Sequence, residues 1–192
     1  MSATPARTKR WSRLEYERLV ELGAFPPGDR VELVAGELLV REPQRSPHAT
    51  GIRAVEEALR SALGPGWEVR TQMPVALDDE SEPEPDVIVA PGSFRDYSHA
   101  HPSRPALLVE VAESSLAYDR EDKGSLYARA RVPEYWIVNL EERVLEVYRE
   151  SGPDVAAAHG WAYRTTQRLG PEDCVTPLAA PSARIRVADL LP

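Results

Sequence analysis

Three carboxylates lie inside segments of this chain that otherwise have the pattern of apolar strands. Glu110 interrupts the apolar run 106–112, Asp86 opens the apolar run 87–90, and Glu32 lies within a short apolar strand. A buried carboxylate is unfavourable unless it is paired, hydrogen-bonded or bound to a metal. Two neighbouring strands that each place one carboxylate near the same end predict a hard-cation site. Mg²⁺ is typically held in this way, by one or two carboxylates together with waters and substrate phosphate oxygens.

Each of these carboxylates also has a purely structural interpretation. Glu110 can lie at the exposed end of its strand and meet one of the many arginines. Asp86 follows a proline, and Pro-Asp is common in turns. Glu32 can face outward in a plain apolar–polar alternation. The sequence leaves both interpretations open at all three positions.

Lys123 is the fourth candidate, because lysine is rare in this chain. Of the 23 basic residues only two are lysines, Lys9 and Lys123, which leaves 21 arginines. We expect Lys123 in the first turn of a helix that begins near Asp119, where a cation opposes the helix dipole. A lysine there supplies a compact charge that can sit close to a water molecule. The alternative is a solvated surface on which the neighbouring acids of 119–122 neutralise it.

The elements that must position these residues follow from capping signals and hydrophobic periodicity. Ser12 and Glu15 form a capping box for a helix that ends at Gly23. The remaining predicted elements are a hairpin of 30–35 and 37–41, a helix over 47–63, strands over 67–77, 86–90 and 106–112, a helix from 119 to about 131, paired strands over 134–140 and 143–149, and further strands over 161–168 and 184–187. This order predicts a protein of both helices and strands (α/β in the broad sense, α+β in the narrower one) built around a mixed sheet.

Length and composition limit the possible classes of protein. A chain of 192 residues is about one domain. We expect a single domain over 1–192, with a core and N-terminal helix and hairpin over 12–150, a C-terminal β extension over 151–192, and a flexible basic tail over 1–10. The single Cys174 excludes a disulfide scaffold and favours a reducing compartment, so we expect a cytoplasmic protein. No apolar run is long enough to span a membrane, and we expect no membrane partner.

The net charge of −8 is concentrated in one segment. Residues 78–86 hold six acids and no base, and without them 25 acids face 23 bases. This balance excludes a uniformly basic nucleic-acid-coating protein. The acids of this segment repel DNA unless they point away from it or help to recruit a metal.

The pattern of Pro85-Asp86, Glu110 on the next strand and Lys123 on the following helix resembles the PD-(D/E)XK nucleases in their migrated-lysine form. The predicted order of helix, three strands, helix and strand over 47–140 matches the restriction-endonuclease-like core of that superfamily. More closely, the chain resembles the Uma family, a bacterial group of restriction-endonuclease-like proteins. That resemblance covers roughly 12–150 and rests on RVELVAGE at 30–37, PDVIV at 85–89, LVEV at 108–111, DKGSLY at 122–127 and VPEYWIV at 132–138.

The resemblance implies a role for each candidate. Asp86 and Glu110 would hold Mg²⁺ or Mn²⁺, with the backbone carbonyl of Val111 as a further ligand. Lys123 would orient or activate the attacking water and offset charge on the phosphate, and Glu32 would bind a metal or its water. The chain departs from the usual pattern at Ala112, where the superfamily places its lysine.

The expected function is therefore divalent-metal-dependent hydrolysis of phosphodiester bonds in DNA. The alternative is a catalytically inactive binding or scaffold protein that keeps the nuclease fold. A third interpretation takes Glu32 and Glu110 as a glycosidase acid–base pair. We also expect a homo-oligomer, with a dimer as the first prediction, because 134–149 and the C-terminal segment are rich in strands.

Overall fold

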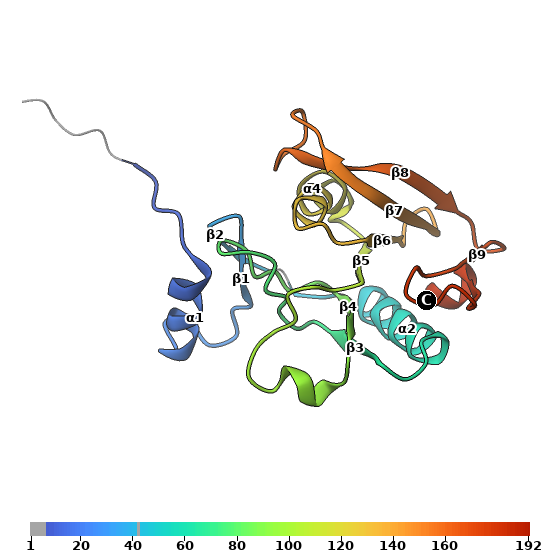
Figure 1. Ribbon diagram of the computed structural model, residues 1–192, viewed down its shortest axis with the longest axis horizontal. Coiled ribbons are helices and arrows are strands. Elements are labelled where there is room, and N and C mark those ends of the chain that lie inside the picture. Colours follow the sequence, from blue (N-terminus) through green and yellow to red (C-terminus); the bar gives the residue numbers. More distant parts are fainter. Residues whose placement is uncertain (1–6, 42) are drawn as a thin grey trace, which may run out of the picture.

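A mixed sheet of six strands forms the centre of the protein in a computed structural model that describes residues 7–41 and 43–192 (Figure 1). The strands follow the order β3, β4, β5, β6, β7, β8. β5 and β6 run parallel, and the other neighbouring pairs are antiparallel. The bounds are β3 (Trp67–Thr71), β4 (Val87–Pro91), β5 (Leu107–Ala112), β6 (Glu134–Asn139), β7 (Val144–Pro153) and β8 (Trp161–Leu169). The α/β fold with a mixed sheet and the predicted core order are confirmed.

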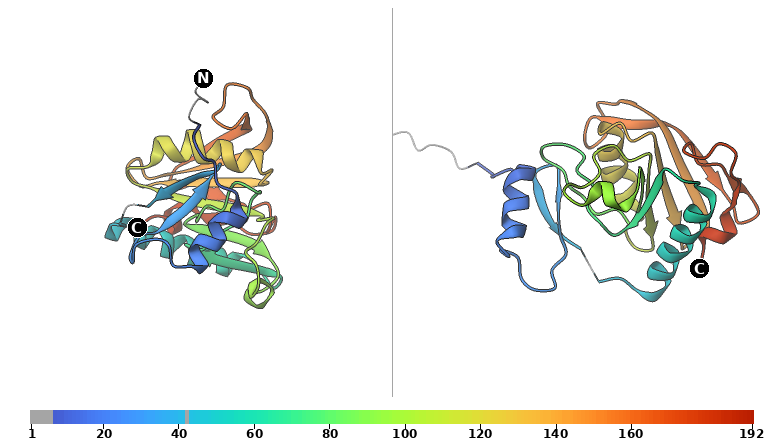
Figure 2. Two further views of the ribbon diagram at one scale, coloured as in Figure 1. Left: turned by 90° about the vertical axis from the view of Figure 1, so that its left-hand side faces the viewer. Right: turned by 60° about the horizontal axis from the view of Figure 1, so that its bottom comes forward.

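Helices cover both faces of this sheet (Figures 1 and 2). α2 (Ser46–Ala62) lies on one face. On the other face a continuous helix over 116–129 joins β5 to β6, as a parallel pair requires. It consists of α3 (Leu116–Tyr118), the π-helical turn η2 (Asp119–Lys123) and α4 (Gly124–Arg129).

The side chains of β5 alternate between these two faces. Val109 and Val111 pack in the core on the α2 side, whereas Leu108 and Ala112 pack in the core on the other side. Because side chains on a strand alternate with a period of two, Glu110 shares the face of Leu108 and Ala112. It therefore points toward the helix over 116–129.

The prediction that Asp119 caps this helix is wrong. The helix begins at Leu116, and the amide of Asp119 already donates to the carbonyl of Ser115 at 2.9 Å. The amide of Gly124 donates to the carbonyl of Asp119, which closes a turn wider than that of an α-helix. Lys123 thus lies inside the helix, where the dipole of the first turn does not act on it.

The predicted strand over 67–77 is also too long. β3 ends at Thr71, and Gln72 adopts a positive φ of 52°. From Val75 onward the backbone bonds to the loop that returns toward β4, with the amide of Val75 donating to the carbonyl of Pro83 at 2.9 Å. The chain therefore turns away from the sheet before it reaches Pro74.

A separate N-terminal layer packs beside the sheet and contains α1 (Arg13–Glu21), β1 (Val31–Val34) and β2 (Glu37–Val40). The predicted capping box of Ser12 and Glu15 and the hairpin are confirmed. Tyr16 packs on Val31 and Leu33 and donates its hydroxyl to the carbonyl of Val31 at 2.7 Å. Residues 1–6 of the predicted tail lie outside the described residues; farther along it, Lys9 pairs with Glu15 at 2.7 Å.

The C-terminal segment adds β9 (Cys174–Val175), β10 (Ile185–Arg186) and the short 3₁₀ helix η3 (Val187–Leu190). Val175, Val187 and Leu190 join the core on the α2 side of the sheet. Figure 2 places this segment at the end of the molecule opposite to the N-terminal layer. Within 7–41 and 43–192, none of the helices has the length and apolar character needed to cross a membrane.

The acidic segment 78–86 is neutralised by arginines rather than exposed as a repulsive loop. The amide of Glu82 donates to the carbonyl of Leu33 at 2.8 Å, which ties the segment to the N-terminal hairpin. Five of its six acids form ion pairs, Asp78 with Arg129, Glu80 with Arg10, Glu82 with Arg13, Glu84 with Arg30 and Asp86 with Arg41. The concentrated negative charge therefore holds the N-terminal layer against the rest of the fold.

Glu82 predicts a measurable pH dependence of stability. Its side chain is buried, and burial together with the charge of Glu17 raises the pKa of its carboxyl to about 7. Because the pKa of Glu82 is higher in the folded than in the unfolded protein, its neutral carboxyl contributes fully to stability below the unfolded pKa. That contribution is lost as pH rises through about 7. Glu82→Gln stays neutral, so its free energy of unfolding should fall less between acidic and mildly alkaline pH, by on the order of 1–3 kcal/mol in urea titrations.

Glu80→Gln is the matched control, because Glu80 lies in the same segment but its ion pair with Arg10 is about half exposed. We expect Glu80→Gln to follow the pH profile of the natural protein. If Glu82→Gln also follows that profile, the raised pKa of Glu82 does not contribute to stability.

Candidate functional site

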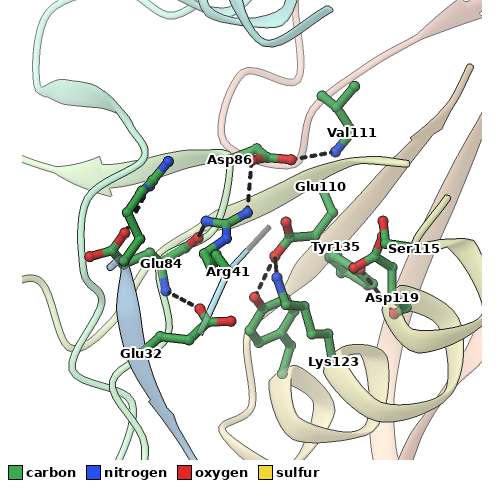
Figure 3. Close-up of polar contacts among 12 residues, drawn as sticks. Glu32, Arg41, Glu84, Asp86, Glu110, Val111, Ser115, Asp119, Lys123 and Tyr135 are labelled. Atoms are coloured by element: carbon green, nitrogen blue, oxygen red, sulfur yellow. Dashed lines mark hydrogen bonds and ion pairs between the residues drawn. The ribbon is translucent and has the colours of Figure 1, made fainter. Parts of the chain in front are cut away.

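Glu110 is held in the middle of the sheet by two donors from one helix. Its side chain is only 2% exposed. The same oxygen, Oε1, accepts from Lys123 Nζ at 2.9 Å and from the Tyr127 hydroxyl at 2.6 Å (Figure 3). Lys123 and Tyr127 are four residues apart and therefore lie on one face of the helix. Both donors use Oε1, and no hydrogen bond to Oε2 comes from any residue within the described ranges.

Burial acts in opposite directions on the pKa values of Glu110 and Lys123. Burial raises the pKa of Glu110 to about 7, against the opposing charge of Lys123. Burial alone would lower the pKa of Lys123, but the negative charges of Glu110, Glu32 and Asp119 outweigh it and raise that pKa. In the metal-free site Lys123 is thus a protonated hydrogen-bond donor to Glu110.

Asp86 lies directly before β4, and its backbone carbonyl accepts from the amide of Gln72 at 3.1 Å. Oδ2 accepts from the amide of Val111 at 2.9 Å and lies 3.2 Å from His48 Nε2. Oδ1 accepts from Arg41 Nη2 at 3.2 Å. Burial would raise the pKa of Asp86, but the neighbouring His48 and the positive charges of Arg41 and Lys123 lower the pKa to about 2.

The backbone of Val111 faces the same place as the Asp86 side chain. The pairing of β4 with β5 ends at Val87 and Val109, so the next part of the β5 edge has no strand beside it. A residue in a strand directs its N–H and C=O to the same edge. Because the Val111 amide reaches Asp86, its carbonyl also points to that open edge.

Glu32 enters the site from the N-terminal hairpin. It lies on β1, is 3% exposed, and accepts the amide of Glu84 on Oε2 at 2.8 Å. The structure thus places Glu32, Asp86, Glu110 and Lys123 along a single cavity of about 490 Å³. Figure 3 shows how three separate parts of the fold bring these side chains together.

Comparison with known proteins gives this arrangement a family. Residues 14–187 match Uma2, described as "Putative restriction endonuclease". The chain belongs to the Uma2 family. A solved structure of "a putative nuclease belonging to DUF820" from Anabaena variabilis superposes with a TM-score of 0.68 at 15% identity, covering 90% of this chain and 96% of the other. A comparison with functionally curated proteins returned no match.

These comparisons confirm the resemblance and the restriction-endonuclease-like fold that the sequence predicted. The Uma2 match extends beyond the 12–150 on which the resemblance rested, into the C-terminal segment. At 15% identity, the solved nuclease demonstrates a shared fold. The roles of the individual residues in this Uma2 protein depend on the geometry of its own cavity.

The side chains in this Uma2 cavity suit a hard cation better than a zinc ion. Nowhere in 7–41 or 43–192 do three or more His, Cys, Asp or Glu side chains gather closely enough to hold a metal. A zinc centre needs three or four such ligands. A Mg²⁺ site needs fewer protein ligands, because the ion keeps several waters. Asp86 and Glu110 line the cavity and the Val111 carbonyl points to the open edge of β5, so oxygen donors of the kind that Mg²⁺ prefers are present.

Sequence reasoning missed Arg41, His48 and Tyr127 as members of the site. Tyr127 lies four residues after Lys123, and that spacing is a local signal that could have placed it on the same helix face. His48 lies within the helix predicted over 47–63, and that prediction gives it no functional role. Arg41 gives no local signal among 21 arginines, since its contact with Asp86 joins residues 45 positions apart.

The pair of Glu110 and Lys123 predicts strong energetic coupling. Lys123→Met leaves a buried carboxylate without its cation, and Glu110→Gln leaves a buried ammonium, so each single variant should unfold at lower urea concentration. The double variant removes both charges and should recover part of that loss. We expect a coupling free energy of about 1–3 kcal/mol in a double-mutant cycle measured by urea unfolding. Additive losses would contradict the pairing.

Proposed function

We propose that this Uma2 protein is a divalent-metal-dependent endonuclease that hydrolyses phosphodiester bonds in DNA. One observation carries the proposal: Asp86 and Glu110 come from neighbouring strands and share a cavity with Lys123. The family and the shared fold support nuclease chemistry in general. The choice of DNA as the substrate rests on the resemblance to restriction endonucleases.

In this proposal Asp86 Oδ1, Glu110 Oε2 and the Val111 carbonyl hold Mg²⁺ or Mn²⁺. The ion, when bound, neutralises phosphate oxygens and lowers the pKa of a bound water. Tyr127 acts as a positioning residue, because its hydroxyl and Lys123 both donate to Oε1, so that Oε2 of Glu110 would be the oxygen that holds the ion.

Lys123 acts as a fixed positive charge. Its raised pKa keeps the ammonium protonated, so it donates to an attacking water or to the phosphate and offsets negative charge that develops there. Glu32 lines the same cavity, with Oε2 fixed by the amide of Glu84. Its remaining oxygen can accept from a metal-bound water.

An inactive binding or scaffold protein is the second candidate. The net charge of −8 and the closed ion pair of Lys123 with Glu110 at 2.9 Å favour it, because both weaken the attraction for phosphate. The two candidates differ in metal-dependent cleavage.

The cytoplasmic location stays a prediction that rests on the lone cysteine. The homodimer also stays a prediction; β6 lies within the sheet, whereas β8 is an edge strand with exposed side chains.

The proposal predicts a separation of metal binding from cleavage. Asp86→Asn and Glu110→Gln should each reduce Mn²⁺ affinity by roughly tenfold or more, because each removes a charged ligand oxygen. Lys123→Ala should keep most of the Mn²⁺ affinity but lower the cleavage rate of supercoiled plasmid by about 10²-fold or more. Calorimetric titration with Mn²⁺ and a gel-based cleavage assay measure the two quantities.

Asp78→Asn is the matched control, because Asp78 belongs to the same acidic segment but pairs with Arg129 away from the cavity. It should bind Mn²⁺ and cleave DNA as the natural protein does. Unchanged Mn²⁺ affinity in both carboxylate variants would overturn the site assignment. Mn²⁺ binding without cleavage of any DNA by the natural protein would favour the scaffold.

A further inference from the structure

Arg41 lies where the proposed cation would bind. It directly follows β2, and its amide donates to the carbonyl of Arg30 at 2.8 Å. Its side chain is 15% exposed. Nη2 reaches Asp86 Oδ1, and Nη1 donates to the backbone carbonyl of Glu84. Figure 3 shows the guanidinium between Asp86 and Glu32, beside Glu110.

The two oxygens of Asp86 are not equally available. Oδ2 already accepts from the Val111 amide and lies beside His48, both of which belong to elements packed in the core. Among residues 7–41 and 43–192, Arg41 is the one that forms a hydrogen bond or ion pair with Oδ1. A cation held by Asp86 therefore competes with Arg41 for Oδ1.

The charges around Arg41 lead to the same conclusion. Glu110, Asp86 and Glu32 all stabilise its positive charge despite its burial. Arg41 thus neutralises the same carboxylates that a divalent ion would neutralise. A guanidinium and a divalent ion on one carboxylate oxygen repel each other strongly in a site that is partly shielded from water.

A phosphate group in the cavity would offer the displaced guanidinium a second partner. Arg45, which also lines the cavity, is 80% exposed, pairs with Glu113 at 3.8 Å and directly precedes α2 as its N-cap residue. The first turn of α2 has no acidic residue and no side-chain cap. This side of the cavity is therefore suited to a phosphate group, which the planar fork of an arginine binds with two hydrogen bonds.

We propose that Arg41 occupies the cation position of the metal-free site, leaves Asp86 when a divalent ion binds, and then contacts a phosphate of the substrate. Arg41 is thus a placeholder for the ion and a phosphate-binding residue of the loaded site. This inference rests on the proposed function. It adds a residue that weakens metal binding, because it competes with the ion, and strengthens DNA binding, because it contacts a phosphate.

The first test is calorimetric titration of the protein with Mn²⁺ alone. Arg41→Ala should bind Mn²⁺ roughly five- to tenfold tighter than the natural protein, because no competing cation remains. Arg30→Ala is the matched control: Arg30 pairs with Glu84 at 2.8 Å on the same hairpin but does not line the cavity, and its affinity should not change. Equal or weaker binding by Arg41→Ala would overturn the exchange.

Arg41→Met covers the case in which Arg41→Ala does not fold, since it keeps an apolar stem without the charge. Circular dichroism establishes which variant is folded, and the same Mn²⁺ titration is then made on that variant. The expected result and the contradicting result are the same as for Arg41→Ala.

The second test measures binding of a short DNA duplex by fluorescence anisotropy, with and without Ca²⁺ as the divalent ion. Ca²⁺ should strengthen DNA binding by the natural protein and by Arg30→Ala, and this gain should shrink by roughly fivefold or more in Arg41→Ala. An equal gain in all three proteins would overturn the phosphate contact.

These outcomes separate the two proposals. If Asp86→Asn binds Mn²⁺ as tightly as the natural protein does, the proposed site fails and the role of Arg41 fails with it. If Asp86→Asn loses Mn²⁺ but Arg41→Ala gains no affinity, the proposed site stands and only the exchange by Arg41 is wrong.

Discussion

The burial of the Glu110 carboxylate inside β5 is the constraint on which the arrangement of the site depends. A charge at the centre of a sheet needs a cation and hydrogen-bond donors close by. Lys123 and Tyr127 supply both from one helix face, on the same oxygen. The helix over 116–129 must therefore cross this face of the sheet with Lys123 and Tyr127 turned toward it. The π-helical turn ends at Lys123, the residue that meets the carboxylate.

Elsewhere in the protein, carboxylates are neutralised by ion pairs with arginines. The acids of 78–86 lie against the N-terminal hairpin, and most are matched by arginines from distant parts of the chain. The net charge of −8 is consequently not a bare repulsive surface at the cavity. Arg41 is the arginine of this network that reaches the proposed metal ligands. In our proposal, the electrostatic balance that stabilises the fold also controls access of a cation to the site.

Much of the fold could be predicted because its signals are local. The capping box of Ser12, the apolar runs of β4 to β6 and the hairpin that turns at Gly36 each mark an element by nearby residues. The start of the helix over 116–129 was mispredicted for the same reason. Asp119 is a residue type that often caps helices. Here its carboxylate accepts a hydrogen bond from the Ser115 hydroxyl, and its backbone carbonyl accepts one from the Tyr135 hydroxyl. The second contact comes from the sheet, 16 positions away.

The sequence by itself determined which residue types could do chemistry and the order of the elements that carry them. Asp86, Glu110 and Lys123 stand out because a charge within an apolar segment is visible without coordinates. The tertiary structure alone decided how each oxygen is used, and it placed Arg41 and His48 on Asp86. Those contacts depend on how the hairpin and α2 pack against the end of β4, and no periodicity or cap along the chain encodes a packing between elements so far apart in sequence.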